Sequence, residues 1–337
     1  MTIKILTKNE LFSVAPYEFR PGYVFVQDPA CDKYDWLVVF DEPPQRDAGT
    51  YRDGTEVLAC PRERTILVTW EPVSIKNYCT GYTRQFGHLL TNRPQKAENH
   101  PHYHLGKGYF PWYIGRSYDE EKAFVSPPKT KVISAICSSK AMRWTQHHNR
   151  IQLLKRLVDE VPGAVWYGHG VHEFDRKCDA MDEYKYHVVL ENHIGSHYWT
   201  EKLADAYLCE CLPFYSGAPD IAEDFPADSF IPIPCDDPDE AIRIIKAAIA
   251  ADEWSKRIDA IREAKSRLLK EYNFWAQIIK VIESESGQSI GRADPATPAV
   301  IRSRKWFRRH SLSAKIEDGL FHTRQYLSGV GLWPKIS

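Results

Sequence analysis

The sequence has no apolar run near the roughly 18 residues that span a bilayer, and its best runs, such as 36–40, are short. Residues 1–12 mix Lys, Asn and Glu with apolar side chains and lack the apolar centre of a signal peptide. We therefore expect a cytoplasmic chain. Lys and Arg number 44 against 45 Asp and Glu, a net charge of −1, which argues against a nucleic-acid partner bound by bulk positive charge.

None of the eight cysteines forms a C-x-x-C pair, and they are scattered along the chain. We expect reduced, mostly buried thiols, with neither a zinc ribbon nor a disulfide framework. The sequence also has no internal repeat and no extended low-complexity segment. Its 43% hydrophobic and 26% charged content excludes wholesale disorder, and 337 residues suffice for about two domains.

The pattern of the sequence changes near the proline-containing segment 126–131, which we interpret as an interdomain linker because two prolines stop any helix. Before it, apolar runs predict short strands separated by turns. After it, strands and helices alternate, which argues for a parallel sheet covered by helices, with ligands at the carboxyl ends of the strands. The elements predicted there are strands at 132–136, 164–167, 186–190 and 212–215, and helices at 146–160, 200–210, from Pro238, and along 253–283.

The segment 184–203 has the chemistry of a phosphate site. A buried strand ends in Glu191 and Asn192, a loop containing Gly and Ser follows, and a helix begins just before Lys202. Free backbone N–H groups at a helix start, with a lysine beside them, can bind phosphate, and Glu191 and Glu201 can accept hydrogen bonds from sugar hydroxyls. The residues alone fit an ordinary solvated first turn better, because strand–loop–helix phosphate sites are weak signals.

This segment resembles the donor-binding motif of α1,3-fucosyltransferases of the bacterial type, glycosyltransferase family 10. The similarity covers about residues 130–285 well and the N-terminal region weakly. The matching elements are Tyr184-Lys185, Glu191-Asn192 and Tyr198-Trp-Thr-Glu-Lys202, followed by Asp205-Ala-Tyr, Pro213-Phe-Tyr-Ser-Gly217 and Phe225-Pro-Ala-Asp-Ser-Phe230.

The resemblance implies an α/β protein of GT-B type, with two Rossmann-like domains and a cleft between them. Residues 1–125 would bind the acceptor, 126–285 the nucleotide-sugar donor, and 286–337 would form a basic, aromatic C-terminal tail. The implied enzyme transfers fucose from GDP-fucose to a glycan hydroxyl in an α1,3-type linkage, with inversion and without a metal or other cofactor. Its acceptor would be an oligosaccharide or a lipid-linked glycan. The alternatives are the same fold with another nucleotide sugar, or a non-catalytic glycan- or nucleotide-binding protein.

Several donor contacts follow from the same resemblance. Two cations, Arg150 and Lys202, would stabilise the negative charge that develops on departing GDP, in place of a divalent ion. Arg150 follows Ser138-Ser-Lys140, which resembles a family pattern. We reject a metal at Asp237-Pro-Asp239 because a helix cap explains these residues. The donor-binding residues expected are Arg150, Glu191, Asn192, Tyr198, Thr200, Glu201 and Lys202.

Inversion also requires a base that takes the proton of the acceptor hydroxyl. Glu71 follows the apolar run 65–70, and family members place a glutamate after the comparable strand, within Thr-Gly-Glu or a similar motif. Here Trp70 replaces the glycine. The resemblance therefore makes Glu71 the expected base, and the ordinary alternative is a strand-terminal carboxylate that caps a loop.

Two further segments carry unusual side chains. His100-Pro-His-Tyr-His104 presents three histidines in five residues, but no suitably spaced carboxylate or cysteine accompanies them, so we expect no metal there. Residues 299–337 carry a local net charge of +6, against −7 for the rest, and include Trp306 and Phe307. This basic segment fits peripheral contact with an anionic membrane, at the inner face of the cytoplasmic membrane. It fits equally well a structural tail that returns across the first domain.

Overall fold

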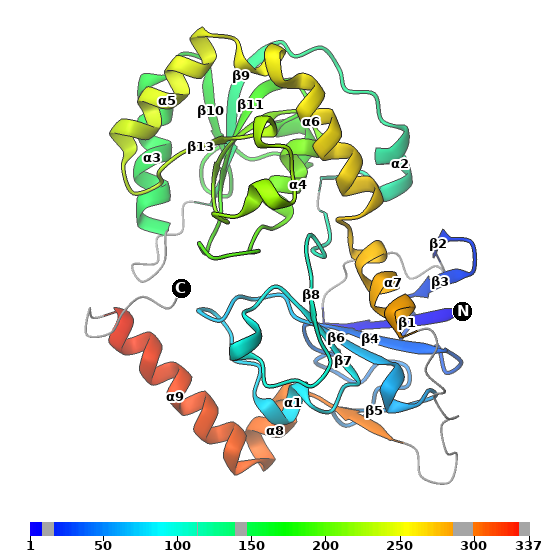
Figure 1. Cartoon of the computed structure of the whole chain (residues 1–337). Coiled ribbons are helices and arrows are strands. Elements are labelled where there is room, and N and C mark those ends of the chain that lie inside the picture. Colours follow the sequence, from blue (N-terminus) through cyan, green and yellow to red (C-terminus); the bar gives the residue numbers. More distant parts are fainter. Residues whose placement is uncertain (9–16, 113, 139–146, 286–298, 330–337) are drawn as a thin grey trace. The chain divides into compact units, whose positions relative to one another are not determined.

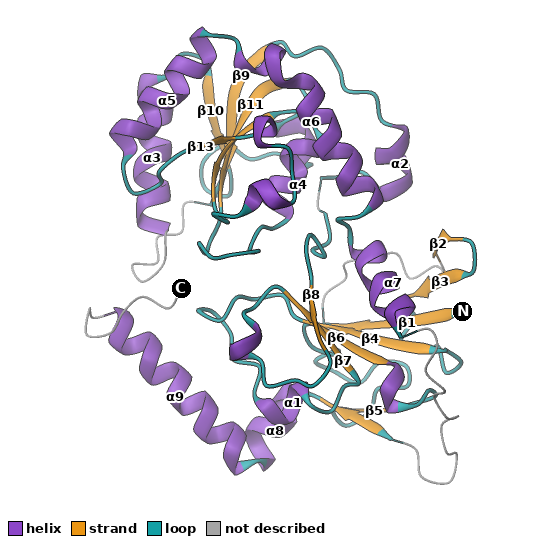
Figure 2. Ribbon diagram, in the orientation of Figure 1, coloured by secondary structure: helices purple, strands orange, loops and turns teal. Residues whose placement is uncertain are grey.

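The computed structural model describes residues 1–8, 17–112, 114–138, 147–285 and 299–329 (Figure 1). The chain divides into two compact units. Unit 1 comprises Met1–Gly106 and Gln277–Ile336, and unit 2 comprises Lys107–Ala276. Each unit contains a largely parallel sheet with helices, as Figure 2 shows. These sheets confirm the expected α/β class. They also confirm the two Rossmann-like units that make up a GT-B-type protein.

The main sheet of unit 1 has the order β2-β3-β1-β4-β6-β7-β8, and all neighbouring pairs are parallel except the antiparallel pair β2–β3. Its central strands are continuous apolar runs because both faces are buried; all five residues of β4 are buried. The strands are β1 (Thr2–Thr7), β2 (Tyr17–Arg20), β3 (Tyr23–Val26), β4 (Trp36–Phe40), β6 (Thr65–Val68), β7 (His88–Thr91) and β8 (Tyr103–Leu105).

The remaining elements of unit 1 come from both parts of the chain. A second, two-stranded sheet pairs β5 (Thr55–Val57) antiparallel with β14 (Val300–Arg302). The helices are α1 (Thr80–Thr83), most of α7 (Phe274–Ser284), α8 (Arg304–His310) and α9 (Leu312–Gly329), with short 3-10 turns at Arg62–Arg64 and Gln95–Ala97. No helix in the described ranges is long and apolar enough to cross a membrane.

Unit 2 contains a five-stranded sheet with the order β10-β9-β11-β12-β13, parallel throughout. Figure 2 shows α3 and α5 on one side of this sheet and α4 and α6 on the other. The strands are β9 (Lys131–Ile136), β10 (Ala164–Tyr167), β11 (Tyr184–Leu190), β12 (Leu212–Ser216) and β13 (Ile231–Pro232). The helices are α2 (Tyr118–Ala123), α3 (His147–Glu160), α4 (Glu201–Leu208), α5 (Pro238–Ala250) and α6 (Glu253–Lys270), with 3-10 turns at Lys177–Ala180, Ile221–Glu223 and Ala227–Ser229.

Most elements predicted for this half of the chain are confirmed, because their apolar patterns and caps are local. Asp237 accepts a hydrogen bond from the Glu240 N–H (3.1 Å) and begins α5, with Pro238 in the first turn. The long helical pattern of 253–283, however, is two helices, α6 and α7 (Phe274–Ser284). Asn273 separates them: its side-chain amide donates to the Leu268 carbonyl (3.1 Å), and its oxygen accepts from the Ala276 N–H (2.9 Å).

The units divide at different places from the boundaries expected at 125/126 and 285/286. Helix α2, which precedes the proline segment, is fastened inside unit 2. Glu121 is fully buried and pairs with Arg116 (2.6 Å) and Lys265 (3.0 Å), while the Tyr118 hydroxyl donates to the Leu269 carbonyl (2.5 Å). The two prolines lie between α2 and β9, inside unit 2, and do not separate the units. The assignment of acceptor and donor binding to the two domains stays a prediction.

The basic tail returns to unit 1. Beyond the β14–β5 pairing, Arg304 bonds Glu42 (2.7 Å), and Glu317 accepts from the Thr80 N–H (2.8 Å). Phe307 packs edge-on against Tyr82, with ring centroids 6.4 Å apart. The structural role that the sequence left open is thus confirmed for the described part of the tail. Membrane contact stays a prediction; the apolar side chains on α9 that it would use are exposed, namely Leu312, Ile316 and Leu320.

Truncation of Ile301 tests whether the tail stabilises unit 1. Its side chain is fully buried in the core of this unit, with Leu58 and Phe86 among its neighbours. Because the change removes apolar burial and leaves a cavity, Ile301→Ala should lower the free energy of unfolding by about 2–5 kcal/mol. Leu312→Ala, at a tail position that is 74% exposed, should change it by less than about 0.5 kcal/mol. Urea unfolding measures both, and equal effects would contradict the inference.

Candidate functional site

The strand order of unit 2 creates a switch point between β9 and β11. Strand β10 follows β9 along the chain and lies on one side of it, whereas β11 comes next and lies on the other side. The connections that leave β9 and β11 therefore diverge, and in open parallel sheets ligands bind outside the carboxyl ends of such strands. Cys137 follows β9, Glu191 and Asn192 follow β11, and Arg150 lies in the first turns of α3.

A buried carboxylate joins the end of β11 to the start of α4. Glu191 is 1% exposed and accepts hydrogen bonds from the Thr200 N–H (2.8 Å) and hydroxyl (2.8 and 3.0 Å). Thr200 is the N-cap of α4, and its hydroxyl oxygen accepts from the Lys202 N–H (3.4 Å). The predicted helix start is confirmed, and Glu191 fixes its position relative to the strand.

Lys202 lies among acidic and hydroxyl groups at this helix start. Its Nζ is 3.3 Å from Glu201, 3.5 Å from Glu191 and 3.2 Å from the Thr200 hydroxyl. Burial opposes its charge, but Glu201 and Glu191 outweigh burial and raise the pKa of Lys202. The pKa of Glu201 is lowered: burial opposes ionisation, and the charges of Lys202 and Lys177 outweigh it. Both side chains are therefore charged at neutral pH.

Arg150 is a buried cation with an unusual set of partners. Its side chain donates to the Asn192 side-chain oxygen and to Cys137 Sγ (3.1 Å), and the residue is 4% exposed. Its Nε has no hydrogen-bond partner, and within the described ranges no carboxylate forms an ion pair with it. Because a buried charge is costly unless it is paired, this guanidinium is suited to an anionic ligand. Of the preceding motif, Ser139 and Lys140 lie outside the described residues.

The loop between Glu191 and Thr200 positions the other expected residues. Tyr198 is buried, with its ring 5.1 Å from that of His193. Asn192 is exposed except for its bond to Arg150. Asp220 was not among the residues predicted from the sequence; its carboxylate accepts from the His197 backbone N–H (2.9 Å) and lies 2.8 Å from the His197 Nδ1. His197 has φ of 60°, so this contact supports a backbone conformation that is uncommon for a non-glycine residue.

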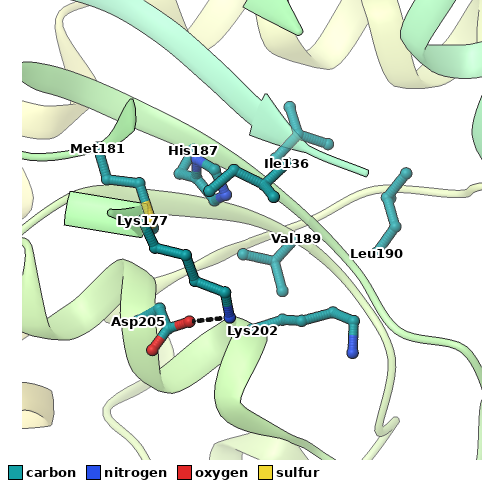
Figure 3. A pocket seen from close by; sticks show the side chains of 9 residues that line it. Ile136, Lys177, Met181, His187, Val189, Leu190, Lys202 and Asp205 are labelled. Atoms are coloured by element: carbon teal, nitrogen blue, oxygen red, sulfur yellow. Dashed lines mark hydrogen bonds and ion pairs between the residues drawn. The ribbon is translucent and has the colours of Figure 1, made fainter. Parts of the chain in front are cut away.

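Figure 3 shows a small pocket lined by residues of β9, β11 and α4, among them Ile136 and Lys202. Lys177 also lines it, and the sequence did not indicate this residue. Its Nζ bonds Asp205 (2.7 Å), whereas the Lys202 side chain extends away from this pair (Figure 3). The cavity holds about 20 Å³, room for about one water molecule. Lys177 belongs to a short 3-10 turn, which carries no periodic pattern by which a sequence could place it.

Glu71, the expected base, lies in unit 1, three residues beyond the end of β6. The Tyr78 hydroxyl oxygen accepts from the backbone N–H groups of Trp70 (3.1 Å) and Glu71 (3.4 Å) and donates its own proton to Asp41. Trp70 packs on Phe40, with ring centroids 5.0 Å apart. The predicted placement of Glu71 after a buried strand is confirmed, and its role as a base stays a prediction.

The family resemblance is confirmed for part of the chain. Residues 126–247 match the family described as glycosyltransferase family 10 (fucosyltransferase), C-terminal part. This segment contains β9 to β12 and every residue of unit 2 that the sequence predicted to contact a donor. Residues 126–247 are thus similar to the C-terminal part of glycosyltransferase family 10.

Individual proteins are similar over different lengths. The α-(1,3)-fucosyltransferase FucT of Helicobacter pylori is 39% identical over 71 residues, which is 21% of this chain and 15% of that protein. A solved α1,3-fucosyltransferase with GDP-fucose is 17% identical, with a TM-score of 0.47, over 87% of this chain and 92% of that one. A sucrose-phosphate synthase of Thermosynechococcus elongatus is 9% identical, with a TM-score of 0.44, over 84% of this chain and 87% of that one.

His187 on β11 lines the pocket of Figure 3. We expect this buried histidine to make the free energy of unfolding depend on pH. Burial and the nearby charge of Lys177 lower its pKa to about 3, whereas an unfolded histidine titrates near about 6.5. Below that value the unfolded chain binds the extra proton, so acid destabilises the fold. Between about pH 7.5 and about pH 5 this group should remove about 2 kcal/mol of stability.

His187→Gln should lack this share of the pH dependence. Denaturant unfolding of the native protein and the variant at both pH values isolates it, since any pH-independent loss of packing cancels in the difference. His169→Gln, at a position whose side chain is 84% exposed, should keep the native dependence. Identical pH dependence in native protein and His187→Gln would show that His187 is not held neutral.

Proposed function

We propose that the chain is an inverting glycosyltransferase that transfers fucose from GDP-fucose to a glycan hydroxyl in an α1,3-type linkage. The observation that carries this proposal is Arg150, a buried guanidinium without a carboxylate ion-pair partner among the described residues. It lies at the switch point of a sheet within the segment that matches glycosyltransferase family 10. The diphosphate of a nucleotide sugar would supply the negatively charged partner that Arg150 lacks among the described residues.

Arg150 and Lys202 form the diphosphate site in this proposal. Their charges lie close enough for Arg150 to oppose protonation of Lys202. As the bond between the sugar carbon and GDP breaks, negative charge grows on the β-phosphate, and two fixed cations stabilise that charge without reorganising. They therefore do the work that a divalent ion does in other transferases, and we propose that donor binding requires no metal.

The remaining donor residues divide into contacts and supports. Asn192 is exposed and holds the Arg150 guanidinium, while Glu201 presents a charged carboxylate suited to a ribose or fucose hydroxyl. Glu191 and Thr200, 1% and 3% exposed, position the start of α4 through their mutual hydrogen bonds. Tyr198, also buried, supports the loop from behind. The proposal therefore moves Glu191, Tyr198 and Thr200 from the direct donor contact expected of them to positioning.

Unit 1 supplies the base in this proposal. Glu71 follows β6 in the sheet, and its backbone is anchored through Tyr78 to the buried Asp41. Its carboxylate would accept the proton of the acceptor hydroxyl as the oxygen attacks the sugar carbon from the face opposite GDP. This displacement inverts the configuration at that carbon. The acceptor, an oligosaccharide or a lipid-linked glycan, is accordingly assigned to unit 1.

Lys202→Met tests the diphosphate site. Loss of one charge-assisted hydrogen bond costs about 1.5–3 kcal/mol, so the Kd for GDP-fucose should rise about 10- to 150-fold. Lys256→Met, at a surface lysine whose side chain is 59% exposed in the same unit, is the matched control and should bind normally. Calorimetric titration measures both. Unchanged binding by Lys202→Met would remove this residue from the site.

The same titrations with UDP and CMP sugars test the donor itself. If the native protein binds one of these nucleotide sugars and no GDP compound, the donor is not GDP-fucose but that other nucleotide sugar.

Glu71→Gln tests the base. The amide cannot accept the hydroxyl proton, so kcat should fall about 10²- to 10⁴-fold, with the Kd for GDP-fucose unchanged because the donor residues lie in unit 2. Glu18→Gln, the same change at an exposed position of unit 1, should retain activity. Full turnover by Glu71→Gln would exclude the assignment. Native protein that binds GDP-fucose but transfers to no glycan would favour a binding protein.

A further inference from the structure

Two histidines and a glutamate meet at the amino end of strands in unit 1. His88 begins β7, His104 lies in β8, and Glu285 directly follows α7. His88 Nδ1 is 3.2 Å from His104 Nε2 and 3.9 Å from Glu285 Oε1. The ligand atoms of all three residues lie within 4.8 Å of one another. They are far apart in the sequence, so only the fold brings them together.

The orientation of His88 is fixed by the backbone. Its Nε2 is 2.9 Å from the Glu63 carbonyl oxygen. Because a carbonyl can only accept, Nε2 carries the proton of the neutral ring, and Nδ1 presents its lone pair toward His104 and Glu285. Metal-binding histidines have this arrangement, in which the second ring nitrogen donates to a carbonyl or carboxylate and holds the first toward the ion.

The spacing of the three ligand atoms suits a tetrahedral ion. Zinc bound to imidazole nitrogen at about 2.0–2.1 Å places two ligand atoms about 3.3 Å apart, close to the separation of the two imidazole nitrogens. Glu285 would have to approach His88 by only about 0.6 Å to reach that spacing. The side chains of His88 and Glu285 are only 4% and 11% exposed, so a metal would compete with little solvent.

We propose that His88, His104 and Glu285 bind one Zn²⁺ ion, with water or the neighbouring His102 in the fourth position. The ring centroids of His102 and His88 are 5.3 Å apart. The ion would join β7 and β8 to the chain that follows α7, and so fasten an edge of the sheet. The proposal revises the expectation of no metal at 100–104, because Glu285 is the carboxylate that the local sequence lacked.

This inference is independent of the proposed transfer reaction. Glu71 follows the carboxyl end of β6, whereas His88 lies at the amino end of the adjacent strand β7. Two nitrogen ligands and one carboxylate are a ligand set that zinc accepts. The role assigned to the ion is structural, and its readouts are metal content and thermal stability rather than activity.

A second group of similar composition provides a control. His197, Asp220 and Glu223 also lie within ligand distance of one another, in unit 2. There Asp220 is already bonded to the His197 backbone N–H, and Glu223 is 63% exposed and 3.8 Å from Lys107. These contacts occupy the carboxylates with other partners, so we do not expect this group to hold the ion.

The test measures zinc in the full-length protein after exposure to excess Zn²⁺ and gel filtration. We expect one zinc per chain in the native protein and more than a tenfold loss of Zn²⁺ affinity in Glu285→Gln and His104→Gln. Glu223→Gln makes the same chemical change in the second group, and His169→Gln removes an exposed histidine; both should retain the zinc. Zinc should raise Tm in the native protein and both controls, but not in Glu285→Gln.

Three outcomes would overturn the proposal: native protein without zinc, zinc retained by Glu285→Gln, or zinc lost from Glu223→Gln. Circular dichroism of each variant distinguishes loss of the ion from loss of the fold. If His104→Gln does not fold, the conservative Glu285→Gln change decides, because Glu285 lies outside the sheet. Cobalt substitution adds a direct readout: visible absorption typical of tetrahedral Co²⁺ should appear in the native protein and not in Glu285→Gln.

Discussion

The contact between Glu191 and Thr200 is the interaction on which the geometry of the proposed donor site depends. A carboxylate at the end of β11 receives both the N–H and the hydroxyl of the residue that caps α4. Burial raises the pKa of Glu191, and the charge of Lys202 acts against that effect. The carboxylate, the capping hydroxyl and the lysine thus form one network whose members hold each other in place. Replacing any of them would shift the first turn of α4 and the cation it carries.

The sheet order explains why this network faces Arg150. Because β11 lies on the opposite side of β9 from β10, the loops after β9 and β11 diverge and leave space above the sheet. Arg150 enters that space from α3 and is held by Asn192, the second residue after the end of β11. The protein therefore buries a guanidinium without supplying an ion-pair partner from the described residues, a costly arrangement that a bound anion would relieve.

The sequence predicted the elements around this site well and the long-range features poorly. Buried parallel strands are continuous apolar runs, and caps such as Thr200 and Asp237 mark helix starts locally, so β9 to β12 and α3 to α5 were predictable. The break at Asn273, the fastening of α2 to α6 and the pairing of β14 with β5 depend on contacts between distant residues. Lys177 and Glu285 were missed for the same reason: each meets its partners only in the folded chain.

The folded structure also changes the meaning of the charge pattern. The tail, with its local net charge of +6, uses part of that charge internally: Arg304 pairs with Glu42, Arg308 with Asp318, and Arg302 lies over the Trp306 ring. The tail is therefore a structural part of unit 1, and only its exposed residues are accessible to another molecule. The remaining chain carries −7 and cannot attract an anionic donor by its overall field. In the function proposed above, donor binding therefore rests on a few placed cations, namely buried Arg150 and charged Lys202.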